Sequence, residues 1–411
     1  MFMPHNTASL NQGTKDTSTS AKRAAPIYLD GFATLPLASE ARSAMLAAWE
    51  LPGNAGSPNG SGERAAQIIA NARAEVASLI GAAASEMIFT SGATEANNLA
   101  LIGVATAAKP HSTRRRIIVS AVEHKAVLEP AAYLGTQGFE ISIAPVDKNG
   151  RLDLEAFAAL LDENVLLISV MLVNNETGII QPVAEAAALA RRVGAFVHSD
   201  AAQGAGKIQI DVSQLDVDYL SLSAHKCYGP MGVGALYVAA GMPSPIPLMR
   251  GGGQQSGIRP GTEPVPLIAG FGAAAVAAAQ ALAQSRTAKT IPKIDRLLDA
   301  LSKQQVRYWR ITGDHAVVPG SATISIDGVD ADSLCAHLAN EVSLSTGSAC
   351  NSGQLRMSHV LEAMGFTEST ARSVIRILCD RTSTDSDIDR AAAAIVLSIR
   401  RSHLATGEVR Q

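Results

Sequence analysis

The stretch SLSAHKCYGPMGVGALYV, residues 221–238, indicates both the fold of the chain and the position of a reactive group. An apolar run leads into Ser223, His225 and Lys226, and then turns through glycines and a proline. A lysine in this position is either a surface residue just past a strand or an amine held where something must react with it. The rest of the chain decides between these two interpretations.

The overall composition limits the class of protein. The chain has 411 residues, enough for two domains with ample core, and its 47% hydrophobic content is ordinary for a globular protein. The formal net charge of −3 gives no electrostatic basis for a nucleic-acid or membrane partner. We therefore expect no membrane association and no direct binding of nucleic acid.

The cysteine content argues against a disulfide framework and against a zinc site. The four cysteines are Cys227, Cys335, Cys350 and Cys379. They show no C-x-x-C spacing and have no cluster of histidines beside them. We therefore expect no metal site and a reducing compartment.

The first 25 residues are rich in Ser, Thr and Ala and lack the apolar core of a secretory signal. We interpret them as a disordered tail. An organellar transit peptide is the weaker alternative, because Arg23 is the only arginine in this segment. The expected location is the cytoplasm, with organellar import left open.

Short apolar runs alternate with helical patterns from residue 62 onward. Strands are predicted within EMIF (86–89), RRIIVS (115–120), VLLISVMLV (165–173), AFVHSD (195–200) and VDYLSLSA (217–224). Continuous apolar strands with helices between them are typical of a mostly parallel sheet that is covered on both faces. The sequence therefore predicts an α/β fold.

The character of the chain changes after a long helix that is predicted over residues 265–284. Beyond residue 290 or so, SATISIDG (321–328) and SVIRILCD (373–380) are predicted strands with helices between them. We interpret this region as a smaller α+β domain. The prediction is a large domain over residues 36–285 and a small domain formed by residues 26–35 and 286–411.

Polar residues that look out of place come after the apolar strands of the large domain. They are Thr94, His124, Asn175, Asp200, Gln203, Ser223, His225 and Lys226. In open α/β sheets ligands bind outside the carboxyl ends of the strands. These side chains are therefore expected to share one site.

Two features suggest a phosphorylated cofactor at that site. TSGATEANN (90–98) is a small-residue turn that opens a helix, where free amides suit a phosphate, although an ordinary N-cap is an equal alternative. Asp200 ends a strand, and a buried aspartate is costly unless it meets a cation such as a protonated pyridoxal ring nitrogen. A capping aspartate is the alternative. With Lys226 able to form a Schiff base in the same sheet, cofactor binding is favoured.

Several motifs in order resemble one family. From about Tyr28 to about Arg381 the chain resembles cysteine desulfurases of the iron–sulfur-cluster and nitrogen-fixation type, within the class V aminotransferase group of pyridoxal-phosphate enzymes. The motifs are SGATEANN, EHKAVLEP, VNNETGIIQP, HSDAAQGAGK, DYLSLSAHKCYGP, GGGQQSGIRPGT and STGSACNSG. The resemblance implies the pyridoxal-phosphate fold type I, with a large sheet of the seven-stranded type and a small α+β domain.

The resemblance also implies roles toward pyridoxal 5'-phosphate. Lys226 would form the Schiff base, Asp200 would pair with the ring nitrogen, and His124 would stack on the ring. Asn175 and Gln203 would approach the side of the ring that carries the phenolic oxygen. The phosphate would be held by Ala93, Thr94, Ser223 and His225, with Thr262 of the partner subunit.

On the substrate side, Arg376 would clamp the carboxylate of L-cysteine, because its planar fork of donors suits a carboxylate. Asn54 and Asn175 would border the substrate. Cys350, in a polar loop at about residues 345–356, would be the nucleophile. A buried core cysteine is the usual alternative, and this alternative fits Cys335 and Cys379.

The implied activity converts L-cysteine to L-alanine in a homodimer. Sulfur would leave as a persulfide on Cys350 for an acceptor protein such as an iron–sulfur scaffold, and Cys350 could touch an iron–sulfur cluster during this transfer. The alternatives are a selenocysteine lyase or transaminase of the same fold, or a scaffold subunit with reduced catalysis.

The sequence departs from the family pattern at several positions. DGFATLP replaces D-N-A-A-T-T-P and so introduces Gly31, Phe32 and Leu35, while Asn59 stands at a histidine position and Met231 at a lysine position. LCDR (378–381), with Asp380, replaces S-L-G-R. None of these departures removes a predicted catalytic residue, but they bear on how substrate reaches the site.

Overall fold

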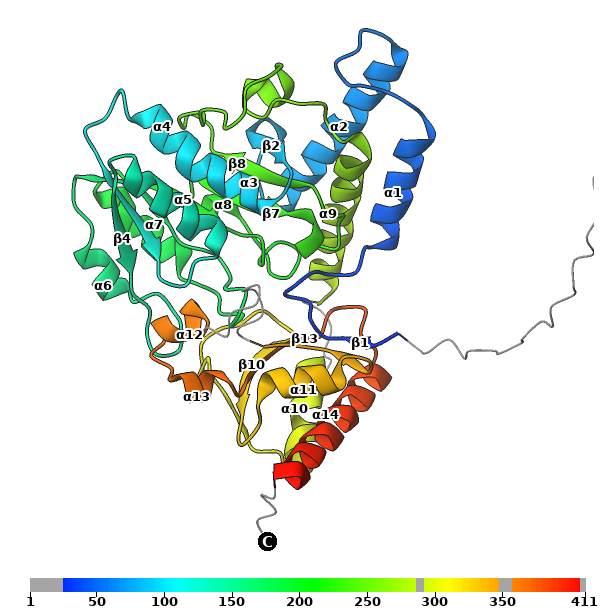
Figure 1. Ribbon diagram of the computed structural model, residues 1–411. Coiled ribbons are helices and arrows are strands. Elements are labelled where there is room, and N and C mark those ends of the chain that lie inside the picture. The colour runs from blue at the N-terminus through cyan, green and yellow to red at the C-terminus, as the bar shows by residue number, and fades with distance from the viewer. Residues whose placement is uncertain (1–24, 286–291, 347–356, 407–411) are drawn as a thin grey trace, which may run out of the picture.

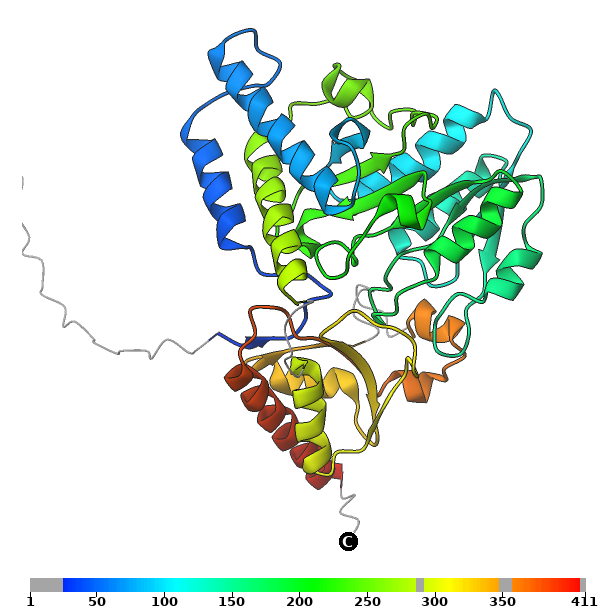
Figure 2. The ribbon, with the colours of Figure 1, turned by 180° about the vertical axis from the view of Figure 1, so that it is seen from behind.

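The computed structural model describes residues 25–285, 292–346 and 357–406 of the chain. A seven-stranded sheet with its helices forms one half of the molecule, and a four-stranded sheet with its helices forms the other (Figure 1). Seen from behind, the same two halves meet along a boundary that the N-terminal segment follows (Figure 2).

The larger sheet is mostly parallel, as predicted. Its strands are β2 (Met87–Thr90), β3 (Arg116–Ser120), β4 (Glu140–Ala144), β5 (Val165–Ser169), β6 (Phe196–Asp200), β7 (Tyr219–Ser223) and β8 (Gly234–Val238). They lie in the order β2-β8-β7-β6-β5-β3-β4, and β8 runs antiparallel to both of its neighbours. The strand predicted over 165–173 ends earlier, at Ser169. β4 was not predicted, because this edge strand has exposed positions and no continuous apolar run.

Alternation along the strands divides the large domain into two apolar layers. Ile118, Ile168 and Leu220 pack in one core with α2 (Gly60–Leu79), α7 (Val183–Arg192) and α9 (Val265–Ser285). Ile117, Leu167 and Tyr219, one position away on each strand, pack in another core with α3 (Ala93–Asn98), α4 (Val104–Ala108) and α5 (Lys125–Thr136). Successive strand residues face opposite sides, so the continuous apolar runs indicate helices on both faces.

Within the described residues, α9 is the helix that is long and apolar enough to cross a membrane by length and composition. It packs against α2 and α1 (Ser39–Glu50), and it buries Ile268 and Phe271. A Cβ atom at Gly272 would lie 2.7 Å from Cα of Ala72, so the two helices touch backbone to backbone. These contacts are those of a core helix.

The smaller sheet has the order β12-β13-β10-β9, and all of its neighbouring strands are antiparallel. Its strands are β9 (Tyr308–Arg310), β10 (Ser321–Ile326), β12 (Ser345–Thr346) and β13 (Val374–Leu378). The core of this half also contains residues of α10 (Lys293–Lys303), α11 (Ala331–Leu338) and α14 (Asp385–Thr406). The short helices are α6 (Leu154–Ala159), α8 (Val212–Leu215), α12 (His359–Ala363) and α13 (Glu368–Ala371).

The N-terminal segment connects the two halves. β1 (Ile27–Tyr28) pairs in parallel with β11 (Val342–Ser343), so the described chain begins on the smaller half. The amide of Leu35 then donates to the carbonyl of His225, 3.0 Å away, which attaches the segment to the larger half. Residues 30–34 therefore lie where the two halves meet (Figure 1).

Two departures from the family pattern, Gly31 and the leucine of LCDR, are direct neighbours. A Cβ atom at Gly31 would lie 2.7 Å from Cδ2 of Leu378 and 3.1 Å from Cδ2 of Leu35. Leu378 is larger than the serine of the family pattern, and it lies where a side chain at position 31 would begin. Asn59 has a local role as N-cap of α2, accepting from the amides of Ser61 and Gly62, while Met231 is exposed on the surface.

Gly31→Ala should lower the free energy of unfolding by about 2 kcal/mol, because the new methyl group overpacks the contact with Leu378. Equilibrium denaturation would measure this loss. Gly60→Ala is the matched control, since nothing lies within 4 Å of a Cβ atom at Gly60. Adding Leu378→Ala to Gly31→Ala should destabilise less than the sum of the two single changes. Strict additivity would contradict the proposed contact.

Candidate active site

The predicted site residues from the large domain lie at the carboxyl ends of neighbouring strands. Asp200 is the last residue of β6, Ser223 is the last residue of β7, and Lys226 ends the 3-10 turn Ala224–Lys226 that follows β7. His124 follows β3 and directly precedes α5. Since β3, β5, β6 and β7 are parallel neighbours, the topology itself gathers these side chains at one edge of the sheet.

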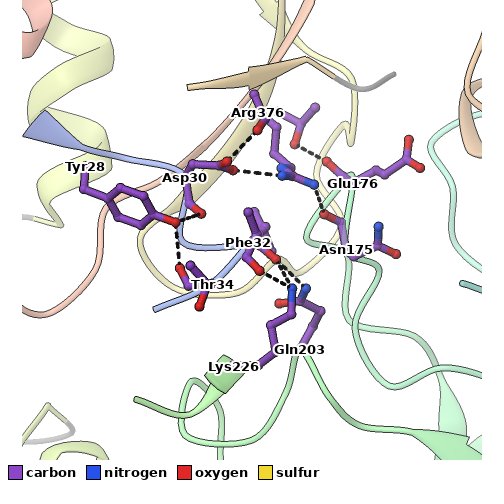
Figure 3. Close-up of polar contacts among 12 residues, drawn as sticks. Tyr28, Asp30, Phe32, Thr34, Asn175, Glu176, Gln203, Lys226 and Arg376 are labelled. Atoms are coloured by element: carbon purple, nitrogen blue, oxygen red, sulfur yellow. Dashed lines mark hydrogen bonds and ion pairs between the residues drawn. The ribbon is translucent and has the colours of Figure 1, made fainter. Parts of the chain in front are cut away.

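The amine of Lys226 is held by the N-terminal segment (Figure 3). Its Nζ donates to the carbonyl oxygens of Phe32, 2.5 Å away, and Ala33, 2.7 Å away. Gln203 donates through Nε2 to the same Phe32 carbonyl at 2.8 Å. Two backbone carbonyls of the N-terminal segment therefore hold the Lys226 amine at the boundary of the two halves. An amine that is to react must be positioned in this way.

Asp200 supplies a buried negative charge. Its carboxylate accepts from Nδ2 of Asn97 at 2.6 Å and from the amide of Ala202 at 2.9 Å. No ion pair with a cation within 4.0 Å involves this carboxylate among the described residues. A buried carboxylate without a cation fits the protonated ring nitrogen of pyridoxal phosphate, so the donor set suits that cofactor.

His124 caps the N-terminus of α5, where its Nδ1 accepts from the amide of Ala126 at 3.0 Å. Burial lowers the pKa of His124; the charge of Asp200 opposes this effect, and the charge of Lys226 adds to it. The accepting Nδ1 and the lowered pKa both favour a neutral ring. A neutral imidazole suits stacking on an aromatic cofactor.

The residues expected to hold the phosphate come from three segments. Ala93 and Thr94 begin α3 after Gly92, as the helix-start prediction requires. Burial, with the charge of Lys226, lowers the pKa of His225 to about 4, and its Nδ1 lies 3.1 Å from the hydroxyl of Thr34. His225 is thus a neutral donor or acceptor near the site.

Thr262 is exposed, in the loop that precedes α9. This loop is fixed to the start of α3 and to β2 in the same chain. Arg259 pairs with Glu95 at 3.0 Å, and Oε1 of Gln255 accepts from the amide of Phe89 at 2.9 Å. Thr262 is therefore exposed on a loop that these two contacts hold in place.

Arg376 approaches the site from the small domain (Figure 3). Its side chain is 8% exposed; Nη2 pairs with Oδ1 of Asp30 at 2.8 Å, and Nη1 donates to the carbonyl of Asn175 at 2.8 Å. The ring of Phe32 lies 5.5 Å from the guanidinium carbon. Nε is buried and has no hydrogen-bond partner among the described residues.

Cys350 lies outside the described residues, but the chain on both sides of it is attached to this site. Ser345 donates to Oδ2 of Asp30 at 2.6 Å, and Ser358 donates to the carboxylate of Glu176. Asp30 therefore joins Arg376 to the strand that leads into the cysteine segment (Figure 3). The part of the predicted loop at residues 345–346 is strand β12, because Ser345 and Thr346 pair with β13.

Three acidic residues of the site were missed by the sequence-based predictions: Asp30, Glu123 and Glu176. Glu123 is fully buried, and burial raises its pKa well above the usual value, while its carbonyl accepts from Nε2 of His359 at 2.9 Å. Burial also raises the pKa of Glu176. In the sequence, Glu123 and Glu176 are carboxylates within the motifs EHKAVLEP and VNNETGIIQP. These motifs were used only to establish the family resemblance.

Asn54 is not joined to these residues by any hydrogen bond of the described structure. It is exposed, and its Oδ1 accepts from the amide of Gly56 at 3.0 Å. Among the described residues, no group of three or more His, Cys, Asp or Glu side chains could hold a metal ion.

Asp30→Asn should lower the free energy of unfolding by about 3 kcal/mol near neutral pH, because the buried charge of Arg376 loses its counter-ion. Denaturant titration would measure the loss. Asp385→Asn is the matched control, since its pairing with Arg296 is exposed and should contribute less than about 1 kcal/mol. Equal losses in the two variants would show that the Asp30 pair behaves as a surface pair.

Comparison with known proteins places the chain in a family. The aminotransferase class-V model matches residues 27–390. The chain is 40% identical over 380 residues to the cysteine desulfurase IscS of Rickettsia bellii (strain OSU 85-389), covering 92% of each chain. Solved structures include a NifS-like protein (TM-score 0.84, 34% identity, 92% of this chain and 100% of that one). SspA in complex with cysteine is another (TM-score 0.74, 33% identity, 85% and 98%). The chain belongs to the aminotransferase class-V family.

Proposed function

We propose that this protein is a pyridoxal-phosphate-dependent cysteine desulfurase that converts L-cysteine to L-alanine and takes up the sulfur as a persulfide on Cys350. The observation that carries the proposal is the meeting of Lys226, from the large sheet, and Arg376, from the small sheet, on the same N-terminal segment. Relatives named cysteine desulfurase and a structural neighbour that binds cysteine support the choice of substrate.

The cofactor would be held by residues from several strand ends. Lys226 would bind it covalently, Asp200 would pair with the ring nitrogen, and His124 would lie against the ring. The other contacts would come from Ala93, Thr94, Asn175, Gln203, Ser223 and His225. When bound, pyridoxal phosphate would supply an electron sink for the charge released at the substrate Cα.

Arg376 would bind the substrate carboxylate through its guanidinium group, while Asp30 and the Asn175 carbonyl fix the plane of that group. Such positioning places the substrate for reaction at low entropic cost. The Nζ of Lys226 would move the proton from the substrate Cα. Asn54 and Asn175 would border the substrate.

Cys350 is the nucleophile that the chain offers. Burial raises the pKa of Cys227 and of Cys335 to about 11 and that of Cys379 to about 12, so these thiols are poor nucleophiles at neutral pH. Thr346, which pairs with Ile375 next to Arg376, precedes Cys350 by four residues, a span of at most about 14 Å.

In the proposed sulfur transfer, the Cys350 thiolate attacks the substrate sulfur. The new S–S bond forms as the Cβ–S bond of the substrate breaks. The carbon skeleton takes up a proton at Cβ, regains at Cα the proton that Lys226 removed, and leaves as alanine. The persulfide would then pass to an acceptor protein, for which an iron–sulfur scaffold in the cytoplasm is the proposed partner. Cys350 would be the contact point in that transfer.

A homodimer is the proposed assembly, in which Thr262 of the partner subunit completes the phosphate site. The exposure of Thr262 on a loop fixed by Arg259 and Gln255 supports this arrangement. Light scattering should give the mass of two chains, and Thr262→Ala should weaken cofactor retention without dissociating the dimer. A monomer that holds the cofactor tightly would contradict this assignment.

Cys350→Ser is the decisive test of the desulfurase function. The variant should bind pyridoxal phosphate and L-cysteine with nearly unchanged absorbance spectra, because Lys226, Asp200 and Arg376 are intact. It should lose almost all release of alanine and sulfide, and the loss should appear in kcat because the thiolate acts in the bond-breaking step.

Cys335→Ser is the matched control and should leave turnover unchanged. Lys226→Ala should in addition lose covalent attachment of the cofactor, measured by borohydride trapping and peptide mapping. Wild-type sulfide release from Cys350→Ser would refute the desulfurase function. Amino-group transfer to a keto acid by that variant would identify a transaminase.

A further inference from the structure

Lys207 contacts the backbone of the active-site lysine, and no role has been assigned to it above. Its Nζ donates to the backbone carbonyl of Lys226 at 2.8 Å and to Oε1 of Gln203 at 3.3 Å. Lys207 also lines a pocket between the two halves of the molecule. It therefore touches two residues that are proposed to hold the cofactor.

The contact with Lys207 determines which way the amide of Gln203 points. An ammonium group can only donate, so it selects the amide oxygen of Gln203 and leaves the NH₂ group on the other side. That NH₂ group donates to the carbonyl of Phe32, the same oxygen that accepts from Nζ of Lys226. Lys207, Gln203, Phe32 and Lys226 form one connected network.

Lys207 also brings a second ammonium group close to the amine of Lys226. Burial and, to a smaller extent, the charge of Lys226 lower the pKa of Lys207 to about 7. Repulsion between two like charges is mutual, so a charged Lys207 favours the unprotonated form of the Lys226 amine. Only the unprotonated amine can form a Schiff base.

The other titratable groups around Lys207 do not cancel this repulsion. Cys227 is buried and its pKa is raised to about 11, so it is a neutral thiol at neutral pH. Burial keeps His225 neutral, because its pKa lies at about 4. The pocket that Lys207 lines contains basic and acidic groups together. Its lining includes Lys293, Arg296, Lys303, Arg381, Asp299, Asp380, Asp385 and Asp389.

We propose that Lys207 is a positioning residue for the reaction of Lys226. It fixes the Lys226 backbone and the Gln203 amide, and in its charged form it lowers the proton affinity of the Lys226 nitrogen. The inference rests on the proposed binding of pyridoxal phosphate at Lys226.

The test is a pH titration of the visible absorbance of the full-length protein loaded with pyridoxal phosphate, in wild type, K207M and K207R. The midpoint should be lowest in K207R, where the charge is permanent, intermediate in wild type, and highest in K207M. The increase from wild type to K207M should be on the order of one pH unit, which corresponds to about 1.4 kcal/mol of interaction between the two groups. If K207R does not fold, the direction of the shift in K207M still decides.

K293M is the matched control. Lys293 lines the same pocket and also donates to backbone carbonyls, those of Asp380 and Arg381, but it does not contact Lys226. Its titration midpoint should equal that of wild type. A midpoint in K207M that equals wild type, or an equal shift in K293M, would overturn the proposal.

A second readout concerns stability. Between about pH 7 and pH 10 the unfolded chain retains the Lys207 proton that the folded chain has lost, so the stability of wild type should rise with pH relative to K207M. Parallel stability curves would contradict a lysine held at low pKa. Failure of the wild-type protein to bind pyridoxal phosphate at Lys226 would instead refute the proposed function, which separates the two hypotheses.

Discussion

The active site depends on where the backbone carbonyl of Phe32 lies. It accepts from the amine of Lys226 and from the amide of Gln203, both of which belong to the large half. Two residues earlier in the same segment, Asp30 pairs with Arg376 of the small half. One short turn, closed by the hydrogen bond from the Ala33 amide to the Asp30 carbonyl, therefore sets the relative positions of the group that would bind the cofactor and the group that would bind the substrate. A shift of this stretch would disturb both contacts at once.

The charges around this stretch are distributed unequally. Lys207 donates to Gln203 and to the carbonyl of Lys226 on the large half, whereas Asp30 is the described counter-ion of Arg376 on the small half. Buried positive groups are unfavourable unless an anion or a set of carbonyls meets them. An anionic ligand that enters between the halves would relieve this cost, and both a phosphorylated cofactor and an amino acid carboxylate have the required charge.

The departures from the family pattern at Gly31, Phe32 and Leu378 occur in the two segments that meet beside β13. Gly31 leaves space for Leu378, and the ring of Phe32 lies near the guanidinium of Arg376. Phe32 lies beside Arg376 but replaces none of its hydrogen-bond partners. The altered motif therefore changes the apolar surroundings of Arg376 and leaves its polar contacts, to Asp30 and Asn175, in place.

The sequence by itself determined the mostly parallel α/β sheet, the second α+β half, and the gathering of His124, Asp200 and Lys226 at one edge. Continuous apolar strands and residues at their carboxyl ends are local features, and local patterns can be read along the chain. Only the tertiary structure decided that Asp30 pairs with Arg376 and that Lys207 supports Lys226. The Asp30 pair joins residues 346 positions apart, and the Lys207 contact depends on how the turn after β6 packs beside the turn after β7. Contacts of that kind follow from the packing of whole elements, which no local periodicity encodes.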